Sequence, residues 1–550
     1  MYGKPSGRLN VKGSYFMLLR VAMLFTLGVA LVVTENLSGA DFEVFHFLNR
    51  DSVPLYGGKG EILELTFKHE RSYQNDFFDV TVDVEFTSPS GKKLRVGGFF
   101  YDMHTWKARL APCEIGNWTY SYIFSNNIGE SASGTGSFQC VPSKSHGFVR
   151  KNPDNPFQWI FDDGSPFFPI GFNDGVGNWN NKGTFLGMNW CMDGGFRDDP
   201  DALDSKVDAD YYFETYRAAG FNTFRFSPWN NSYAIYSDLD HYNAAEARYT
   251  DEFMRRLREL DWCIFYGFFG FRQEYLQEPN NVEGMTKIKR FLKYSVDRWG
   301  AYVDFWELLN ELKAAGGWYE ITASYARSID PYRHPITTSW DPPDAGVIDF
   351  LSPHWYQKED ELYSDRVTAD NARKWKSYGK PVVVGEQGNS QSNWDERSAL
   401  RMRIRVWTAL FNEISLIFWN TSYAKHGHNM NIYLGPEERQ YIRVLDDFKK
   451  WMDADTRMTA VTVSDEKSIR AYALSSKGKL GVYMHYCANH DAKIGGKTVT
   501  FTIPRNGEGI WIDPADGRAI ASFKAVAGQN TLAIPPFAVD IALLVTPQAF

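Results

Sequence analysis

Apolar and polar positions alternate with a period of two along the first hundred or so residues after position 41. Residues 62–67 and 80–86 show this alternation, and turn sequences such as residues 88–91 interrupt it. The pattern predicts short β-strands that each have one buried face. About seven strands in roughly 100 residues are typical of a β-sandwich, and we expect one over residues 41–143.

The pattern changes after a polar, Pro- and Ser-containing boundary at residues 142–147. Short apolar runs now alternate with longer amphipathic stretches, such as residues 211–219 and 250–260, which predict helices. The apolar runs that we interpret as strands are residues 167–173, 223–227, 263–269, 305–311, 336–340, 350–356, 382–386 and 416–420. Eight strands alternating with helices over about 300 residues predict an α/β fold, a (β/α)8 TIM barrel over residues 144–457.

The period-two alternation returns beyond residue 458, with Gly, Asn and Pro in the turns and no helical pattern. Residues 481–486 and 498–503 are examples. We expect a second β-sandwich over residues 458–550.

The first 40 residues have a different character. Four Lys and Arg residues lie within the first 20 positions, the apolar run 21–33 follows, and small residues end at Ala40. These are the marks of a secretory signal peptide, and the run is shorter than the roughly 20 residues that a membrane span needs. We expect cleavage after Ala40 and a secreted (extracellular or periplasmic) protein without stable membrane insertion; an uncleaved anchor is the alternative.

Composition narrows the classes of function. The chain has 550 residues, 43% hydrophobic and 23% charged, with a net charge of −8. Two to four globular domains fit this length, and the charge balance argues against a nucleic-acid partner. The 18 Trp and 30 Tyr suit surfaces that meet sugars, although most are expected in the core.

The five cysteines do not form a zinc pattern, and we expect neither a metal nor a cofactor. Cys113 and Cys140 both fall in the first strand-rich region and could pair. His426 and His428 form an HxH sequence after the eighth predicted strand, where a sugar-contacting loop is a better interpretation than a metal pair without a third ligand.

Candidate chemistry gathers at the carboxyl ends of the predicted barrel strands, where barrel enzymes place their active sites. The residues at these ends are Asn173, Arg225, Asn310, Glu311, His354, Tyr356, Glu386 and Trp419. Two carboxylates among polar and aromatic groups fit the cleavage of a glycosidic bond, in which one protonates the leaving oxygen and the other attacks the anomeric carbon or activates water.

These positions suggest separate roles. Glu311 would be the general acid/base, which requires a less polar environment, and Glu386 the nucleophile. Arg225 and Tyr356 would hold Glu386 as a carboxylate. Asn310 would bind the sugar 2-hydroxyl, and a sugar ring would stack on Trp419. Asn173 and His354 complete the predicted substrate-binding set.

Glu307 is the rival acid, because it lies four residues before Glu311 in the same predicted strand. We expect it instead to form an ion pair inside the barrel. Other chemistries have no support, since GxSxG, Walker A and GxGxxG sequences are absent.

Four short motifs, in this order and spacing, resemble clan A of the glycoside hydrolases, the cellulase-like and apiosidase-like barrels. They are residues 220–225 ending in Arg225, 306–311 ending in Asn310-Glu311, 354–356 with His354 and Tyr356, and 382–386 ending in Glu386. The resemblance covers about residues 150–455. It implies hydrolysis of a poly- or oligosaccharide with retention, by double displacement through a covalent glycosyl-enzyme.

The flanking regions are also familiar. The first resembles an uncharacterised domain that precedes such barrels, and the last resembles a module named for collagen binding that follows apiosidase-like barrels.

Some questions stay open at the level of sequence. The carboxylate separation, which distinguishes retaining from inverting enzymes, is not encoded in a motif. A non-catalytic carbohydrate-binding or adhesion protein with a decayed barrel is the alternative function, and transglycosylation by the same residues is another. The Gly-, Asn- and Asp-rich segment 178–210 is expected to shape the cleft. The sugar, its linkage and the oligomeric state are not predicted.

Overall fold

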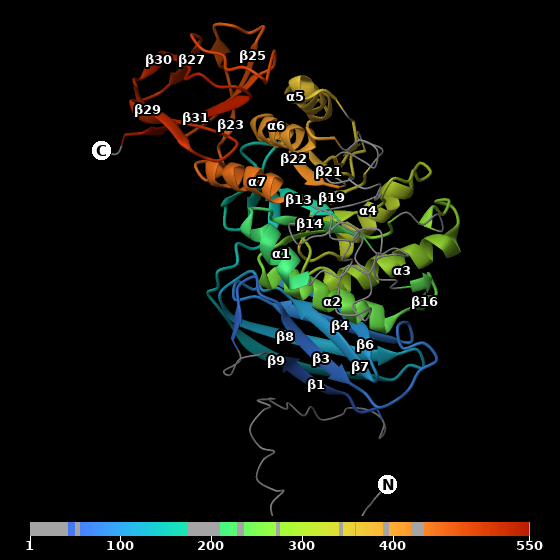
Figure 1. The fold of residues 1–550 in the computed structure, drawn as a ribbon. Helices are drawn as coiled ribbons and strands as arrows, with labels where there is room; N and C mark the ends of the chain where they lie inside the picture. The colour runs from blue at the N-terminus through green and yellow to red at the C-terminus, as the bar shows by residue number, and fades with distance from the viewer. Residues whose placement is uncertain are drawn as a thin grey trace, which may run out of the picture.

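The computed structural model describes residues 42–49, 56–173, 209–227, 236–270, 275–339, 345–357, 359–388, 395–419 and 434–548. Three regions follow one another along the chain, from the N-terminal sheets through a central α/β region to the C-terminal sheets (Figure 1). The expected signal peptide, most of segment 178–210, and both His426 and His428 lie outside the described residues.

Two sheets make up the N-terminal region. The four-stranded sheet has the order β1 (Phe45–Asn49), β3 (Leu63–Lys68), β7 (Thr105–Leu110), β6 (Phe99–Asp102). The five-stranded sheet has the order β2 (Tyr56–Gly58), β9 (Ser131–Val141), β8 (Gly116–Asn126), β4 (Val80–Thr87), β5 (Lys93–Gly97). All pairings are antiparallel except that of β2 with β9.

The alternation seen in the sequence is the reason that these sheets share one core. In β4, every second side chain from Val80 to Phe86 is buried, and those between them face solvent or are half-buried. The buried side chains of both sheets belong to one cluster. Cys113 is exposed and Cys140 is buried, and both are free thiols, so the pairing considered above does not form.

The central region contains an eight-stranded parallel sheet, as the sequence predicts. Its strands are β13 (Ile170–Asn173), β14 (Thr223–Phe226), β17 (Cys263–Gly267), β18 (Phe305–Glu307), β19 (Ile336–Thr337), β20 (His354–Trp355), β21 (Val383–Gln387) and β22 (Ser415–Phe418). The order is β19-β18-β17-β14-β13-β22-β21-β20, which is the cyclic order of a barrel opened between β19 and β20.

Hydrogen bonds outside the strand pairings join β19 to the segment that precedes β20 and so close this opening. The Asp349 backbone N–H donates to the Ile336 carbonyl at 2.8 Å. The Thr337 hydroxyl donates to the Phe350 carbonyl at 2.6 Å. The sheet therefore curls into a TIM-like barrel.

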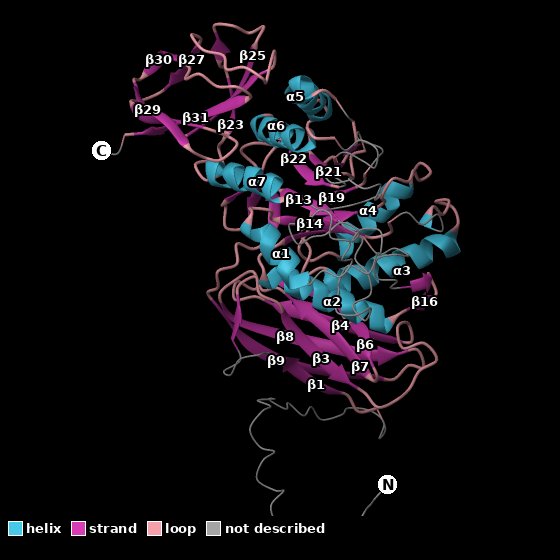
Figure 2. Cartoon of the chain, in the orientation of Figure 1, coloured by secondary structure: helices cyan, strands magenta, loops and turns pink. Residues whose placement is uncertain are grey.

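Helices cover the outside of the barrel (Figure 2). They are α1 (Ala209–Ala218), α2 (Ala244–Glu259), α3 (Val282–Trp299), α4 (Trp318–Ile329), α5 (Ser364–Lys376), preceded by the short η2 (Glu361–Tyr363), α6 (Ser398–Phe411) and α7 (Pro436–Lys449). A small hairpin, β15 (Tyr236–Asp238) and β16 (His241–Tyr242), precedes α2. Asn243 is the N-cap residue of α2, and its side chain accepts hydrogen bonds from two backbone N–H groups of the first turn.

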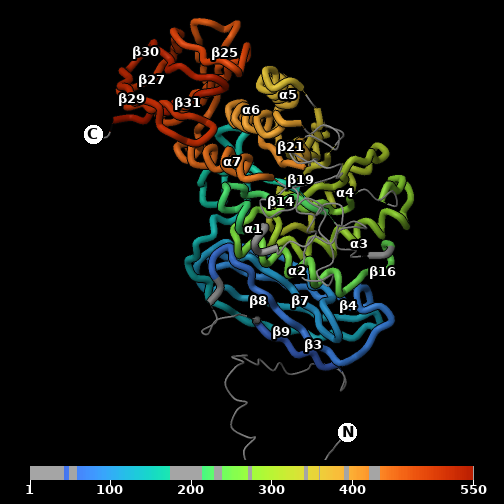
Figure 3. Tube along the Cα trace, viewed as in Figure 1, coloured from blue at the N-terminus to red at the C-terminus, as the bar shows by residue number. Residues whose placement is uncertain are grey.

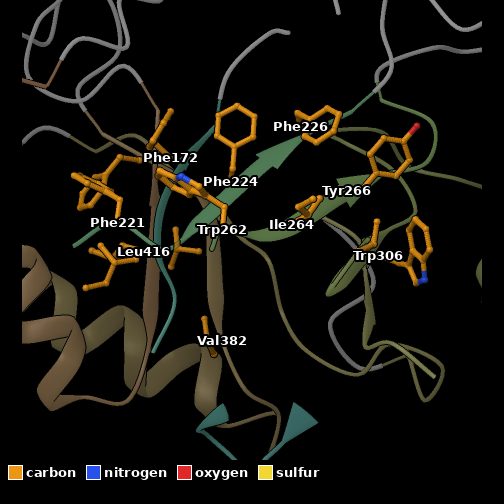
Figure 4. Close-up of a cluster of buried hydrophobic side chains, with 14 of the residues drawn as sticks. Phe172, Phe221, Phe224, Phe226, Trp262, Ile264, Tyr266, Trp306, Val382 and Leu416 are labelled. Carbon is orange, nitrogen blue, oxygen red and sulfur yellow. The ribbon is translucent and has the colours of Figure 1, made fainter. Parts of the chain in front are cut away.

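Each barrel strand buries both faces, which explains why the strands read as continuous apolar runs. The outward side chains, among them Phe172, Phe224, Tyr266 and Trp306, pack under the helices (Figure 4). Inward side chains near the strand starts form a second cluster: Phe265, Phe305, Phe350, Val383 and Ile417.

A three-stranded sheet covers this end of the barrel. It consists of β10 (Val149–Lys151), β11 (Trp159–Phe161) and β12 (Pro166–Phe167). Trp159 lies against Phe305, with ring centroids 4.9 Å apart. The strand expected over residues 167–173 is thus divided between two sheets, because Pro169, which has no N–H to donate, separates β12 from β13.

The C-terminal region is also built from two sheets. The six-stranded one has the order β23 (Arg457–Thr459), β25 (Ile469–Ser476), β26 (Lys479–Tyr486), β31 (Asp540–Pro547), β28 (Gly507–Ile512), β29 (Ala519–Ala525). The three-stranded one has the order β24 (Thr462–Val463), β27 (Thr498–Ile503), β30 (Gly528–Ala533). One cluster of buried side chains joins them.

Buried ion pairs join the three regions. Arg109 of β7 and Arg298 of α3 both bind Asp251 of α2 through two hydrogen bonds each, at 2.8–3.0 Å. On the other side, Arg403 of α6 binds Asp540 of β31 at 2.9 and 3.1 Å. Figure 3 shows α6 and α7 beside the C-terminal sheets. Among the described helices, none combines the length and the apolar character of a membrane span.

Candidate active site

Arg225 lies at the centre of the polar cluster at the carboxyl ends of the barrel strands. It is the third residue of β14, between the outward-facing Phe224 and Phe226. Its Nη1 donates to Glu386 Oε1 at 2.9 Å, and its Nη2 donates at 2.7 Å to both Glu307 Oε2 and Asn310 Oδ1. A single guanidinium therefore links three strand ends.

Glu386 faces the barrel interior because β21 contains a bulge. Along β21 and β22, Val384 pairs with Leu416 and Gln387 pairs with Phe418, so two residues of β21, Gly385 and Glu386, oppose one residue of β22. The extra residue changes the alternation of the strand and aims Glu386 inward. β20 then places His354 next to Glu386 in register.

Both oxygens of the Glu386 carboxylate are occupied by donors. Arg225 binds Oε1, and the Tyr356 hydroxyl donates to Oε2. His354 Nδ1 lies 3.4 Å from the same Oε2. Glu386 is 7% exposed. A buried carboxylate with a cation on one oxygen and a hydroxyl donor on the other is held in one orientation.

Glu311 belongs to a turn and not to a strand, in contrast to the sequence prediction. β18 ends at Glu307, four residues earlier than expected. The reason is that Glu311 has a positive φ of 53°, a left-handed conformation that leaves the extended strand path. The Ser339 hydroxyl accepts a hydrogen bond from the Glu311 N–H at 2.6 Å and donates to the Leu309 carbonyl at 3.1 Å. Strained backbone of this kind persists where neighbouring groups hold it.

His354 connects the two candidate catalytic carboxylates. Its Nδ1 lies 2.8 Å from Glu311 Oε1, and its Nε2 lies 3.5 Å from Arg225 Nη2. His354 can lie in this position because residue 385 is a glycine. A Cβ at Gly385 would lie 3.3 Å from His354 Nε2 and 2.3 Å from Ser352 Oγ. The sequence predicted His354 as a substrate contact, and the structure places it against Glu311.

One oxygen of Glu311, one oxygen of Glu386 and a ring nitrogen of His354 all lie within 4.8 Å of one another. Three such atoms could in principle bind a metal ion. The guanidinium of Arg225 lies 2.9 Å from Glu386 and faces the same carboxylate, which disfavours a second cation there. The arrangement suits two carboxylates that act on a small group between them.

The pKa of Glu311 differs in direction from the sequence expectation. Partial burial acts to raise the pKa of Glu311, but the hydrogen bond and charge of His354, with the charge of Arg225, outweigh it and lower this pKa below its usual value. Burial and the adjacent Glu386 hold the pKa of Tyr356 well above its usual value. Tyr356 is therefore a permanent O–H donor to Glu386.

Glu307 is buried inside the barrel and paired with Arg225, as the sequence reasoning expected of the rival acid. Its side chain is 1% exposed, whereas the Glu311 side chain is 27% exposed. Burial raises the pKa of Glu307 although Arg225 lies against it. Of the two glutamates, Glu311 is the one whose side chain is accessible from solvent.

The remaining predicted site residues have different surroundings. Asn173 is buried, and its amide donates to the Gly385 carbonyl at 3.0 Å, so it supports the bulge in β21. Asn310 accepts from Arg225 through its oxygen, and its amide nitrogen has no hydrogen bond to any described residue. Trp419 is half-buried directly after β22 and packs against the barrel core.

Sequence reasoning missed Ser339, which lies in no motif and acts on Glu311 from the neighbouring strand end. It also missed the sharing of Arg225 between two glutamates. Neither feature has a sequence signal, because each depends on how separate strand ends meet.

Comparison with known proteins finds one match to a part of the chain and others that extend over most of it. Residues 59–125 match a family described as a domain of unknown function, DUF5060. No curated protein matches the chain. A crystal structure of a candidate glycoside hydrolase from Bacteroides vulgatus matches with a TM-score of 0.63 and 15% identity, over 89% of this chain and 100% of that chain.

Two further solved structures are similar at lower scores. A family 39 glycoside hydrolase from Bacteroides cellulosilyticus has a TM-score of 0.44 and 12% identity, over 87% of this chain and 96% of that chain. A GH30 endoxylanase from Clostridium papyrosolvens has a TM-score of 0.41 and 12% identity, over 70% and 98%. Of these three structures, the one from Bacteroides vulgatus is similar enough to establish a shared fold, and the likeness spans most of both chains.

Proposed function

We propose that the protein is a glycoside hydrolase that cleaves O-glycosidic bonds of a poly- or oligosaccharide with retention. Glu386 is the nucleophile and Glu311 is the general acid/base. The observation that carries this proposal is the meeting of one oxygen from each carboxylate within 4.8 Å at the carboxyl ends of the strands of a TIM-like barrel. The shared fold with a candidate glycoside hydrolase agrees with it.

In the first half of the reaction, Glu386 attacks the anomeric carbon and becomes an ester, while Glu311 gives its proton to the leaving oxygen. Arg225 and Tyr356 each bind one oxygen of Glu386 and orient it before the attack. The unpaired amide nitrogen of Asn310 can donate to the sugar 2-hydroxyl, a contact that strengthens in the transition state.

In the second half, Glu311 removes a proton from water, and that water attacks the same carbon and releases Glu386. A separation of about 5 Å between the carboxyl groups is typical of retaining enzymes, and roughly 6.5–9.5 Å of inverting ones. One oxygen of each carboxylate approaches the other to within 4.8 Å, and this proximity supports the retaining course.

The low pKa of Glu311 in the free protein has a consequence for this mechanism. A general acid must hold a proton when substrate is bound, yet His354 favours the charged form of Glu311. Bound substrate would exclude water from the half-exposed Glu311 and place an acceptor oxygen against it, and both effects raise its pKa. Substrate binding would thus prepare the acid.

We also propose that the chain is secreted after removal of residues 1–40, and that the regions flanking the barrel are β-sandwich domains. The basic, apolar and small-residue order of the N-terminus supports the first proposal. Paired sheets with one core each support the second.

The test is substitution of the two glutamates in the full chain. Turnover is measured on a panel of polysaccharides and 2,4-dinitrophenyl glycosides, with analysis of the products. Glu386→Ala and Glu311→Ala each lower turnover, the latter by roughly 10²–10⁴-fold, and azide partly restores Glu386→Ala. The matched control is Glu413→Gln, at a buried glutamate paired with Lys376 before the start of β22. Near-normal turnover in either alanine variant would refute the assignment.

A further inference from the structure

Arg225 binds two carboxylates, and only one of them, that of Glu386, takes part in the proposed mechanism. Nη1 binds Glu386 at 2.9 Å and Nη2 binds Glu307 at 2.7 Å. Glu307 and Glu386 are 1% and 7% exposed. In a poorly hydrated environment, one cation cannot fully stabilise two anions. Each carboxylate therefore weakens the electrostatic stabilisation that Arg225 gives to the other.

Arg225 is the only hydrogen-bond donor to Glu307 among the described residues, and the charge of His354 also favours the carboxylate form of Glu307. Its Oε2 accepts from Arg225, and its buried Oε1 has no hydrogen-bond partner. Burial raises the pKa of Glu307 in spite of the adjacent guanidinium. The stability of the Glu307 carboxylate therefore depends on how strongly Glu386 competes with it for Arg225.

The formation of an ester at Glu386 changes this balance. The ester is neutral, so Arg225 loses one of its two anionic partners while it stays buried. Of the described carboxylates, Glu307 is the only other one within hydrogen-bond distance of Arg225. A buried cation without an anion is strongly unfavourable, and Glu307 can supply that anion.

We propose that Glu307 is a positioning residue that acts as the alternating counter-ion of Arg225. In the free protein it shares the guanidinium with Glu386, and in the glycosyl-enzyme it holds the guanidinium alone. This inference rests on the proposed function, because it takes Glu386 as the group that is esterified.

The charge balance of the cycle follows from this role. As the bond from Glu386 to the anomeric carbon forms, the glycosidic bond breaks and the leaving oxygen takes the proton of Glu311. Glu307 then remains as the carboxylate beside Arg225. When water releases Glu386 as a carboxylate, the two carboxylates share Arg225 again. Asn310 stays on Nη2 throughout and keeps Nη1 aimed at Glu386.

Competition for one cation is reciprocal, and this makes the proposal measurable without any substrate. The full-length protein is labelled with glutamate carrying ¹³C at the δ carbon, and the carboxyl signals are followed by NMR as a function of pH. The signals of Glu386 and Glu307 are assigned by their loss in Glu386→Gln and Glu307→Gln.

We expect Glu307→Gln to lower the pKa of Glu386, because Arg225 then binds Glu386 alone. Glu386→Gln lowers the pKa of Glu307 by the same amount. Glu413→Gln is the matched control, since it removes a buried, ion-paired glutamate near the opposite ends of the strands and leaves both values unchanged.

An unchanged pKa of Glu386 in Glu307→Gln would overturn the proposal and leave Glu307 as a packing ion pair. If that variant does not fold, the pKa of Glu307 in Glu386→Gln decides in the same way. On the 2,4-dinitrophenyl glycoside that the wild-type protein cleaves, the acid limb of kcat/KM in Glu307→Gln moves to lower pH by the same amount, and an unmoved limb counts against the role. The proposed function fails by a different result, normal turnover in Glu386→Ala.

Discussion

Two buried arginine–carboxylate clusters in this protein differ in the balance of cations and carboxylates. At the junction of the N-terminal region and the barrel, Asp251 receives four hydrogen bonds from Arg109 and Arg298. At the ends of the barrel strands, Glu386 and Glu307 share Arg225, and His354 Nδ1 lies 3.4 Å from Glu386. The first cluster has more cations than carboxylates at its centre, and the second has more carboxylates than cations.

The difference extends to hydrogen-bond satisfaction. Trp299 also donates to Asp251, and none of the buried side-chain atoms of Asp251, Arg109 or Arg298 lacks a partner. In the strand-end cluster, Glu307 Oε1 and Arg225 Nε have no partner among the described residues. Full satisfaction makes a cluster rigid, whereas an unpaired oxygen leaves the charged form of a buried carboxylate less well stabilised. The first arrangement suits a domain junction and the second suits a reaction centre.

The largest expected effect is at the junction. Asp251→Ala leaves Arg109 and Arg298 buried together without their shared anion, and it should lower the free energy of unfolding by about 3–5 kcal/mol. Urea denaturation followed by circular dichroism measures this. Turnover per folded molecule should be unchanged, because no described contact links Asp251 to Arg225. A loss of less than about 1 kcal/mol would contradict the contrast, since that is the range of an exposed ion pair.

The strand-end cluster should respond in the reverse way. Tyr356→Phe removes the hydroxyl that donates to Glu386 and leaves the ring in place. A hydrogen bond to a charged group contributes about 1.5–3 kcal/mol, so turnover should fall roughly 10- to 150-fold. Steady-state kinetics and thermal unfolding are measured on the same preparation. A drop in stability with full turnover would place Tyr356 with the structural residues.

The smallest expected effect is a displacement of the pH profile. His354→Gln removes a group that lowers the pKa of Glu311, so that pKa rises. The acid form of Glu311 is lost as the pH rises through its pKa, and a higher pKa therefore moves the alkaline limb of kcat/KM to higher pH. The profile of wild-type and variant protein on one substrate checks this. A limb that stays in place or moves to lower pH would show that His354 does not control Glu311.

Much of the fold was predictable because burial has a period. Eight apolar runs separated by amphipathic stretches predicted the parallel barrel, and all eight strands are present. Their ends were less predictable. Pro169 divides one expected strand, and the left-handed turn at Glu311 shortens another, since both effects depend on local backbone conformation that hydrophobicity does not report.

The candidate site shows the same division. The residue types at the strand ends, Glu311, Glu386 and Arg225 among them, were read from their positions, because a parallel barrel brings the carboxyl ends of its strands together. The lowering of the Glu311 pKa could not be predicted from the sequence, because it depends on His354 from another strand. The sequence also did not indicate that the Asn173 amide donates to the Gly385 carbonyl, because this bond joins two separate strands.

By itself, the sequence determined the three regions, the strand count and the set of chemical groups at one end of the barrel, since these follow from local periodicity and position along the chain. Only the tertiary structure decided how the groups are shared. The bulge that turns Glu386 inward, the Ser339 bond that holds Glu311 and the division of Arg225 between two glutamates each require strand ends that are distant in sequence to meet at hydrogen-bond distance. No pattern within a single strand contains that information.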